Sequence, residues 1–333
     1  YRIGGHGKLV EVDGNLRIKD KYSIAFDFAK SNTQESHQDF INSSESLNNI
    51  TYAMDGEKFS GDAKNIRLKR ETEGNTWGLR FEEISPNYRA DIGFVTQTGF
   101  KNISLWHSRT YRLNNFFRLI RPNITVRKKS DFEGNSIQEM TELGLFFETS
   151  KNFKGNIERK VFDKEQYKNF SFNEQQVRTN LWLNYSPSEV FSIGLSADFG
   201  DRIAYNELIP EIGKQKNYNL NLGLRPNDKL ALSYRHRKIE LSKKYQAGSF
   251  FSGRVDRFST RYSFSNDLSW RVNLESNDFS DDYYLETLFE WRPDPYTIFY
   301  AGSSQFFSDG ESSNNVKLLT SQIYLKFQYF YKI

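Results

Sequence analysis

The feature that most constrains the fold is a strict alternation of apolar and polar residues. In residues 177–200 (VRTNLWLNYSPSEVFSIGLSADFG) nearly every second side chain is apolar, and Ser186 and Pro187 separate two such runs. Successive side chains of a β-strand point to opposite faces, so this period of two predicts strands with one apolar and one polar face. Trp182 is the exception, because it falls on the polar face. Alternation by itself leaves open which face meets water.

The same alternation recurs along the chain and predicts an all-β protein. It is clear in residues 22–28, 218–224, 268–274 and 323–333, where aromatic and aliphatic side chains occupy the apolar positions. Counting such runs gives sixteen to eighteen candidate strands, and no helix of ten residues with capping signals stands out. The stretch 45–75 is ambiguous, because its alternation is broken.

Two kinds of connection separate the predicted strands. Short ones are rich in Pro, Asn, Asp and Ser, which favour tight turns. They fall at Asp20–Lys21 and at 186–189, 226–228, 265–267 and 293–295. Longer polar connections alternate with them, at 32–48, 163–175, 201–215, 241–253, 276–282 and 305–315. This order predicts a sheet with tight turns at one end and long loops at the opposite end.

Composition excludes several classes of protein. The chain has 46 basic and 42 acidic residues, so its net charge of +4 does not indicate a nucleic-acid partner. The mean hydropathy is −0.72, and no apolar run approaches the roughly 18 residues of a membrane helix. Cysteine is absent, which excludes a disulfide framework and any Cys-based metal site. Aromatic residues nevertheless make up 16% of the chain, a content that suits strands.

A soluble sandwich or a propeller would also alternate, but three features favour a membrane barrel. The predicted strands span nine to thirteen residues, which exceeds the usual length of about 5–6 and reaches the 9–11 or so needed to cross a bilayer. The connections alternate between short and long, as in outer-membrane barrels. Aromatic residues also cluster beside the turns, as in a membrane-interface girdle. The girdle candidates are Tyr185, Phe191, Phe264, Trp291, Tyr296, Tyr329 and Tyr331.

We therefore predict a closed antiparallel transmembrane β-barrel of about 16–18 strands, with short periplasmic turns and longer extracellular loops. It would lie in the outer membrane of a Gram-negative bacterium, with its apolar face toward lipid and its polar face toward an enclosed interior. Residues 1–333 would form one barrel domain, in which 1–7 are a flexible lead-in and 32–58 an uncertain loop or insertion.

Three segments resemble a known family: 85–100 (SPNYRADIGFVTQTGF), 261–272 (RYSFSNDLSWRV) and 318–333 (LLTSQIYLKFQYFYKI). They are similar to the C-terminal barrel region of an uncharacterised outer-membrane family of Bacteroidota. Full-length members carry an N-terminal module similar to family-9 carbohydrate-binding domains, so the resemblance implies a link to glycan handling. If such a module belongs to this protein, it lies before Tyr1. The resemblance provides no catalytic pattern. The last strand also resembles the C-terminal signal that the barrel-assembly machinery recognises, although it ends on Ile333 instead of the commoner Phe.

The alternation also assigns charged residues to the polar face, where they would line the barrel interior. These candidates are Arg178, Asp198, Arg225, Arg235, Arg237, Arg257, Arg261, Arg271, Glu275, Glu286 and Glu290. They could line a pore with a basic surface that selects anionic or polar solutes. They could equally form mutually satisfied ion pairs that fill a narrow interior, because unpaired buried charge is costly. Both interpretations remain open.

Catalytic, metal and cofactor sites are not predicted. The four histidines are His6, His37, His107 and His236. His107 and Ser108 are adjacent, which puts them on opposite faces of a strand, and His236 shares a face with Tyr234 in a position typical of an interface belt. The remaining candidates lack the pattern of a known site: the oxygen-rich 276–282, the glycine-rich 4–7, and the calcium-loop-like 13–20 without its glutamate.

Function is open between two main classes. The first is a polar-lined channel or docking barrel linked to carbohydrate binding or uptake. The second is a plugged, non-conducting barrel that anchors a module or belongs to a larger outer-membrane complex. A barrel hydrolase is a third interpretation, for which no convincing catalytic group is found. The expected partners are the lipid bilayer, the assembly machinery, a glycan or polar solute, and other outer-membrane proteins.

Overall fold

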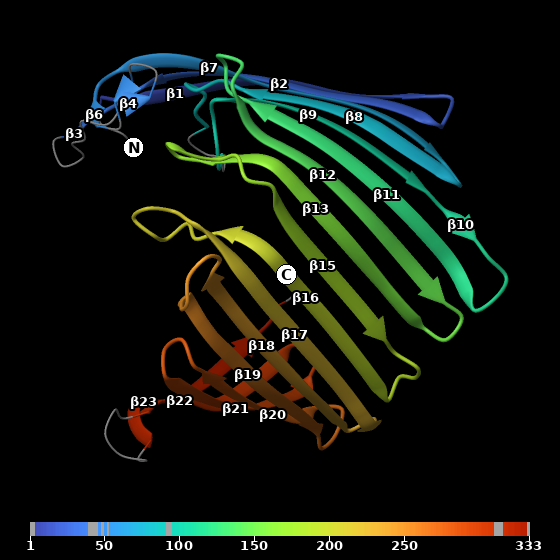
Figure 1. Ribbon diagram of the computed structural model, residues 1–333. Helices are drawn as coiled ribbons and strands as arrows, with labels where there is room; N and C mark the ends of the chain where they lie inside the picture. The colour runs from blue at the N-terminus through green and yellow to red at the C-terminus, as the bar shows by residue number, and fades with distance from the viewer. Residues whose placement is uncertain are drawn as a thin grey trace. The chain divides into compact units, whose positions relative to one another are not determined.

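The computed structural model describes residues 4–38, 46–47, 50–51, 53–90, 95–309 and 316–331 (Figure 1). Every regular element in these residues is a β-strand, which confirms the all-β prediction. The same residues include no helix that is long and apolar enough to span a bilayer. The strands are β1 (His6–Ile18), β2 (Tyr22–Gln34), β3 (His37–Gln38), β4 (Ser46–Leu47), β5 (Ile50–Thr51), β6 (Met54–Asp55), β7 (Lys58–Thr72), β8 (Asn75–Ile84), β9 (Phe100–Arg109), β10 (Tyr111–Arg112), β11 (Phe117–Ser130), β12 (Ser136–Thr149), β13 (Phe153–Tyr167), β14 (Phe170–Phe172), β15 (Gln176–Tyr185), β16 (Phe191–Ile203), β17 (Ile212–Asn227), β18 (Leu230–Lys243), β19 (Ser249–Ser263), β20 (Leu268–Asn277), β21 (Asp282–Asp294), β22 (Thr297–Asp309) and β23 (Val316–Tyr329).

The chain divides into two compact units. Unit 1 comprises Tyr1–Tyr111, Arg121–Leu145 and Lys160–Gln176, and unit 2 comprises Arg112–Ile120, Phe146–Arg159 and Val177–Ile333. In unit 1, β1 pairs with β2, β2 with β7, β7 with β8, β8 with β9, and β9 with β11, all antiparallel. Two small ladders, β3 with β6 and β4 with β5, also belong to this unit.

Unit 2 contains an antiparallel meander in which each strand from β15 to β23 pairs with the next (Figure 1). Residues opposite each other in such a ladder point to the same face. Leu195 of β16 lies opposite Leu220 of β17, while the adjacent Ser196 lies opposite Asn219. The register therefore aligns the apolar positions of neighbouring strands on one face and the polar positions on the other.

The apolar face of unit 2 is largely open. Leu195, Leu274 and Phe289 remain 42%, 47% and 43% exposed, although they belong to the apolar rows. Among the described residues, the buried apolar side chains are few and mostly small or near strand ends. A sandwich would cover this face with a second layer of structure, which would bury these side chains. The face has the character of a surface that meets an apolar medium.

The short turns occur where they were predicted. Only Asp228 and Lys229 separate β17 from β18, and only Pro295 and Tyr296 separate β21 from β22. The connections at the opposite ends of the strands are shorter than expected. β16 extends to Ile203 and β17 starts at Ile212, so nearly half of the predicted loop 201–215 is strand. The reason is that backbone hydrogen bonds continue the ladder even where the side chains of both faces are polar.

Other boundaries also differ from the prediction. β18 and β19 continue into the predicted loop 241–253, leaving 244–248 between them. β1 starts at His6, within the predicted lead-in, because its backbone pairs with the end of β2 at Gln34. Much of the ambiguous stretch 45–75 is β7, whose register with β2 is regular from Lys58 to Arg70. Residues 310–315 and the terminal Ile333 lie outside the described residues.

Candidate functional site

All the charged residues predicted to line an interior lie on the polar face of unit 2. The register links them strand by strand: Asp198 lies on the face of Asn219, and Asn219 is opposite Arg237. Arg235 is opposite Arg257, and Arg257 is opposite Glu275. Period-two alternation from these positions places the remaining members on the same face. Their role in lining an enclosed interior stays a prediction.

Each acidic member of this set has a polar partner. Only one of these contacts joins two members of the predicted set. Arg257 Nε lies 3.1 Å from Glu275 Oε2. Asp198 instead pairs at 3.0 Å with Arg202, and Glu290 pairs with Arg292, two arginines that were not among the candidates. Glu286 accepts a hydrogen bond of 2.6 Å from Asn273 Nδ2. The carboxylates of the face are therefore already engaged.

Several arginines of the polar face lack an ionic partner in the described part of the chain, and three of them lie close together. Arg225, Arg261 and Arg271 are exposed and form no ion pair with another described residue. Among these three side chains, Arg261 Nη2 donates a hydrogen bond to Ser269 Oγ at 3.4 Å. The three line a cavity of about 360 Å³ near the short connections of unit 2. This cavity is the candidate binding site.

Small side chains make room for that cavity. Ser192 lies opposite Gly223, Gly223 opposite Ser233, and Ser233 opposite Ser259, which forms a row of small residues across four strands. All four line the cavity. A Cβ at position 223 would lie 2.6 Å from Ser192 Oγ, so glycine allows the hydroxyl to approach the neighbouring backbone. The row leaves the arginines beside it accessible.

Other arginines of the predicted set are fixed by the protein itself. Arg178 is buried, and its Nε donates to the backbone oxygen of Asp201 at 2.9 Å. Gly200 lies opposite Arg178 and allows the two backbones to approach closely, since its φ is +126° and a Cβ there would lie 2.1 Å from the carbonyl oxygen of Val177. Arg235 Nε donates to Asn221 Oδ1 at 3.0 Å. Hydrogen bonds within the protein hold the side chains of Arg178 and Arg235, which are therefore less available to a ligand.

The aromatic candidates are exposed and lie at the short-turn ends of their strands. Phe264 packs edge-on against Tyr262, with ring centroids 4.9 Å apart, and Trp291 stacks on Phe299 at 5.2 Å. Tyr185 contacts Phe153, which begins a run that the sequence pattern did not identify. That run continues through Phe147 to Phe117. Consecutive contacts on one edge are expected of an interface girdle, although the girdle itself stays a prediction.

The histidines form no nucleophile–base pair in the described contacts. His236 Nδ1 lies 2.7 Å from Asp256 Oδ1, which also accepts a 2.6 Å hydrogen bond from the Tyr234 hydroxyl. These three residues lie on the apolar face of β18 and β19, as the shared face of His236 and Tyr234 predicted. His107 Nε2 contacts Asn75 Oδ1 at 3.2 Å. In the candidate calcium segment, Asp278 is engaged by Arg254 at 3.1 Å.

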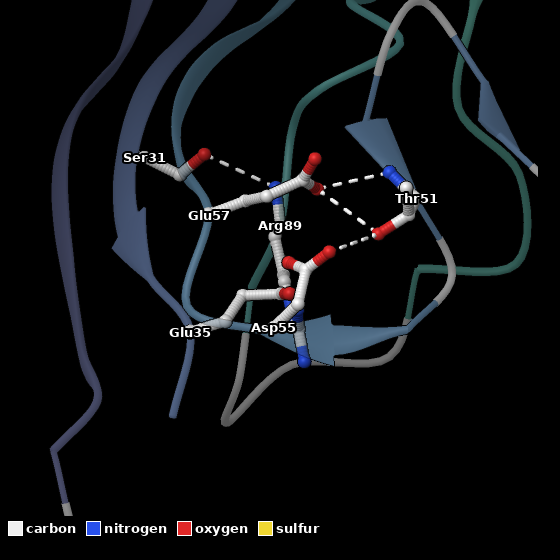
Figure 2. Close-up of polar contacts among 6 residues, drawn as sticks. All are labelled: Ser31, Glu35, Thr51, Asp55, Glu57 and Arg89. Carbon is white, nitrogen blue, oxygen red and sulfur yellow. Dashed lines mark hydrogen bonds and ion pairs between the residues drawn. The ribbon is translucent and has the colours of Figure 1, made fainter. Parts of the chain in front are cut away.

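Unit 1 holds a cluster of three carboxylates that the sequence pattern did not identify. Oxygen atoms of Glu35, Asp55 and Glu57 lie within 4.8 Å of one another (Figure 2). Such oxygens are ligands that hard cations accept. Arg89 already pairs with the buried Glu35, and the backbone N–H of Thr51 donates to Glu57 Oε2 at 2.9 Å. The cluster thus has a counter-ion of its own, although Glu35 Oε2 is buried without a hydrogen bond.

The fold is similar to solved structures of siderophore receptors. A mutant of the ferric enterobactin receptor of Pseudomonas aeruginosa matches with a TM-score of 0.53 and 9% identity, over 96% of this chain and 61% of the receptor. The siderophore receptor PirA of Acinetobacter baumannii gives 0.51 and 8%, over 96% and 64%. The ferric-catecholate import receptor Fiu of Escherichia coli gives 0.51 and 9%, over 98% and 64%. At these identities the likeness shows the fold alone.

The chain spans about three fifths of the length of these receptors. No protein-family model matches the sequence. No curated protein matches it either. The comparisons therefore show a likeness of fold, and the ligand has to be argued from this chain's own residues.

Proposed function

We propose that the protein is an outer-membrane β-barrel that admits polar solutes, in a role linked to carbohydrate uptake. Closure of the strands into a barrel and contact of the apolar face with lipid are part of this proposal. The fold supports it, because the similar solved structures are outer-membrane receptor barrels. The resemblance of 85–100, 261–272 and 318–333 to a barrel region associated with carbohydrate-binding modules supports the link to glycans.

The observation that carries the proposal is the separation of the two faces of unit 2. Leu195, Leu274 and Phe289 are exposed on one face, and Asn219, Arg257 and Glu275 lie on the other. Backbone groups in lipid are satisfied only by helices or closed sheets, so strands with an exposed apolar face suit a membrane barrel. The opposite face then provides a polar surface along which a hydrated solute can pass.

Single-channel recording in planar bilayers tests the proposal. A conducting pore gives steady ohmic current, whereas silence favours the alternative of a plugged anchor or assembly subunit. If unpaired arginines line the path, the wild type prefers anions, and Arg271→Glu shifts the preference toward cations. The control is Lys229→Glu, which changes the charge equally but lies in the β17–β18 turn and outside the candidate cavity. Current with unchanged selectivity in Arg271→Glu would contradict the assignment of this face to the path.

A further inference from the structure

The candidate cavity combines three cations, none of which forms an ion pair with a described carboxylate. Arg225 comes from β17, Arg261 from β19 and Arg271 from β20. The one acidic residue that lines the cavity is Glu189, in the connection between β15 and β16, and it pairs with none of the three. Each guanidinium presents five N–H donors in a planar fork, which suits carboxylate and phosphate oxygens.

Two of these arginines face each other directly. Arg261 and Arg271 are register partners across β19 and β20, with Ala231 on the other side of Arg261. Like charges in directly opposed positions destabilise a sheet. A similar opposition of Arg235 and Arg257 is relieved by Glu275, which lies 3.1 Å from Arg257. No described carboxylate forms an ion pair with Arg261 or Arg271, and an external anion would provide that partner.

The row of small residues beside the arginines provides a second type of contact. Ser192, Ser233 and Ser259 line the same cavity. A serine hydroxyl both donates and accepts hydrogen bonds, as sugar hydroxyls do. Cations next to a row of hydroxyls therefore match a solute that carries an acidic group on a polyhydroxylated ring.

From this geometry we propose that the cavity is a subsite for acidic sugars, in which Arg225, Arg261 and Arg271 bind a carboxylate or phosphate and the serines bind ring hydroxyls. This inference rests on the proposed function, since it names the class of solute that the uptake barrel admits. It requires binding at equilibrium and no chemical step.

Calorimetric titration of the full chain in detergent micelles tests the subsite with three probes: galacturonate, galactose and inorganic phosphate. Galacturonate binds, and galactose binds at least about tenfold more weakly, because hydrogen bonds to charged groups are the stronger ones. Phosphate also binds, but more weakly than galacturonate, since it cannot use the serines. Equal affinities for galacturonate and galactose would overturn the proposal. Equal affinities for phosphate and galacturonate would overturn its sugar component.

Variants assign the binding to the arginines. Arg261→Gln and Arg271→Gln each weaken galacturonate binding by about tenfold or more. Lys229→Gln, which removes a cation from the β17–β18 turn outside the cavity lining, leaves binding unchanged. Without ligand, Arg271→Gln melts no lower than the wild type, because it relieves the like-charge pair. Unchanged affinity for galacturonate in both arginine variants would contradict the inference.

The two proposals fail separately. Ionic current without a preference for galacturonate over galactose would remove the subsite and leave the uptake barrel in place. Binding of galacturonate by a protein that carries no current would remove the channel and leave the subsite as a docking site.

Discussion

Arg257 and Glu275 face each other across β19 and β20, and their charged groups lie 3.1 Å apart. Four residues further along β19, Arg261 faces Arg271, and no described carboxylate lies between them. The same pair of strands thus contains one cross-strand pair of opposite charges and one of like charges. The pair of opposite charges explains how the polar face tolerates its charge, and the pair of like charges marks where we expect a ligand.

Removal of the Glu275 charge should destabilise the protein modestly. In Glu275→Gln, Arg257 loses its partner while Arg235 still lies opposite it on β18. Both members of the pair are partly exposed, so we expect a loss of unfolding free energy of about 1 kcal/mol or less. Urea titration in detergent measures this loss. The double variant Arg257→Gln/Glu275→Gln should recover part of it, and strictly additive losses would show that the two charges are not coupled.

The two faces of a single strand should respond oppositely to charge. Leu195→Arg places a cation on the apolar face of β16, and we expect a loss of roughly 2–4 kcal/mol in lipid, as for arginine on the lipid face of a barrel near the midplane. Ser196→Arg is the matched control, because the adjacent side chain points to the polar face. Unfolding from lipid vesicles compares the two. Equal losses would contradict the assignment of faces, as would a wild-type chain that stays monodisperse without detergent.

The position of Trp291 tests the interface girdle. This indole is 48% exposed and stacks on Phe299 at the short-turn end of β21. In a variant that retains only this tryptophan, we expect fluorescence quenching by lipids labelled near the headgroup to exceed quenching by lipids labelled deep in the chains. A variant that retains only Trp182, on the polar face, should be quenched little by either label. Equal quenching of both tryptophans by lipid would exclude the proposed orientation.

Asp131 should give the turn between β11 and β12 a pH dependence. A hydrogen bond from the Asn135 side chain, joined by backbone N–H groups of Asn135 and Glu133, lowers the pKa of this carboxyl below its usual 3.8. The carboxylate therefore contributes stability that is fully present above about pH 4 and is lost as the pH falls through the lowered folded pKa. Asp131→Ala should remove this dependence and lower the unfolding free energy at pH 7 by about 1 kcal/mol or less, because solvent screens the turn. Melting curves between pH 7 and pH 2 measure both effects, and a parallel decline in wild type and variant would contradict the prediction.

Arg89 should hold the carboxylate cluster of unit 1 together. It pairs with Glu35, and its backbone N–H donates to Ser31 Oγ at 3.1 Å. Arg89→Met leaves the buried Glu35 charge without its counter-ion, so we expect a loss of several kcal/mol of local stability and faster proteolysis near 50–57. Glu35→Gln in the same background should restore resistance, because the uncompensated charge is gone. Proteolysis that stays slow in Arg89→Met would show that another group balances the cluster.

The all-β architecture and the two-faced strands could be predicted because both depend on local periodicity. Leu195 and Ser196 point to opposite faces whatever lies beside them, so a period of two assigned the charged candidates to one face before any pairing was known. Turn chemistry was equally local, and Asn227–Asp228 and Pro293–Pro295 mark connections that the structure contains. Alternation could not locate the ends of β17 and β18, because hydrogen bonding continues where both faces are polar.

The choice of partners depends on register, which relates residues far apart in the chain. Arg257 lies opposite Glu275 and Arg261 opposite Arg271, and a shift of one strand by two residues would keep every face but give both arginines different partners. Tyr185 likewise meets Phe153 from another strand. The cavity needs four strands to bring Ser192, Gly223, Ser233 and Ser259 into one row. Periodicity specifies a direction for each side chain, whereas contact requires the hydrogen-bonded alignment of whole strands.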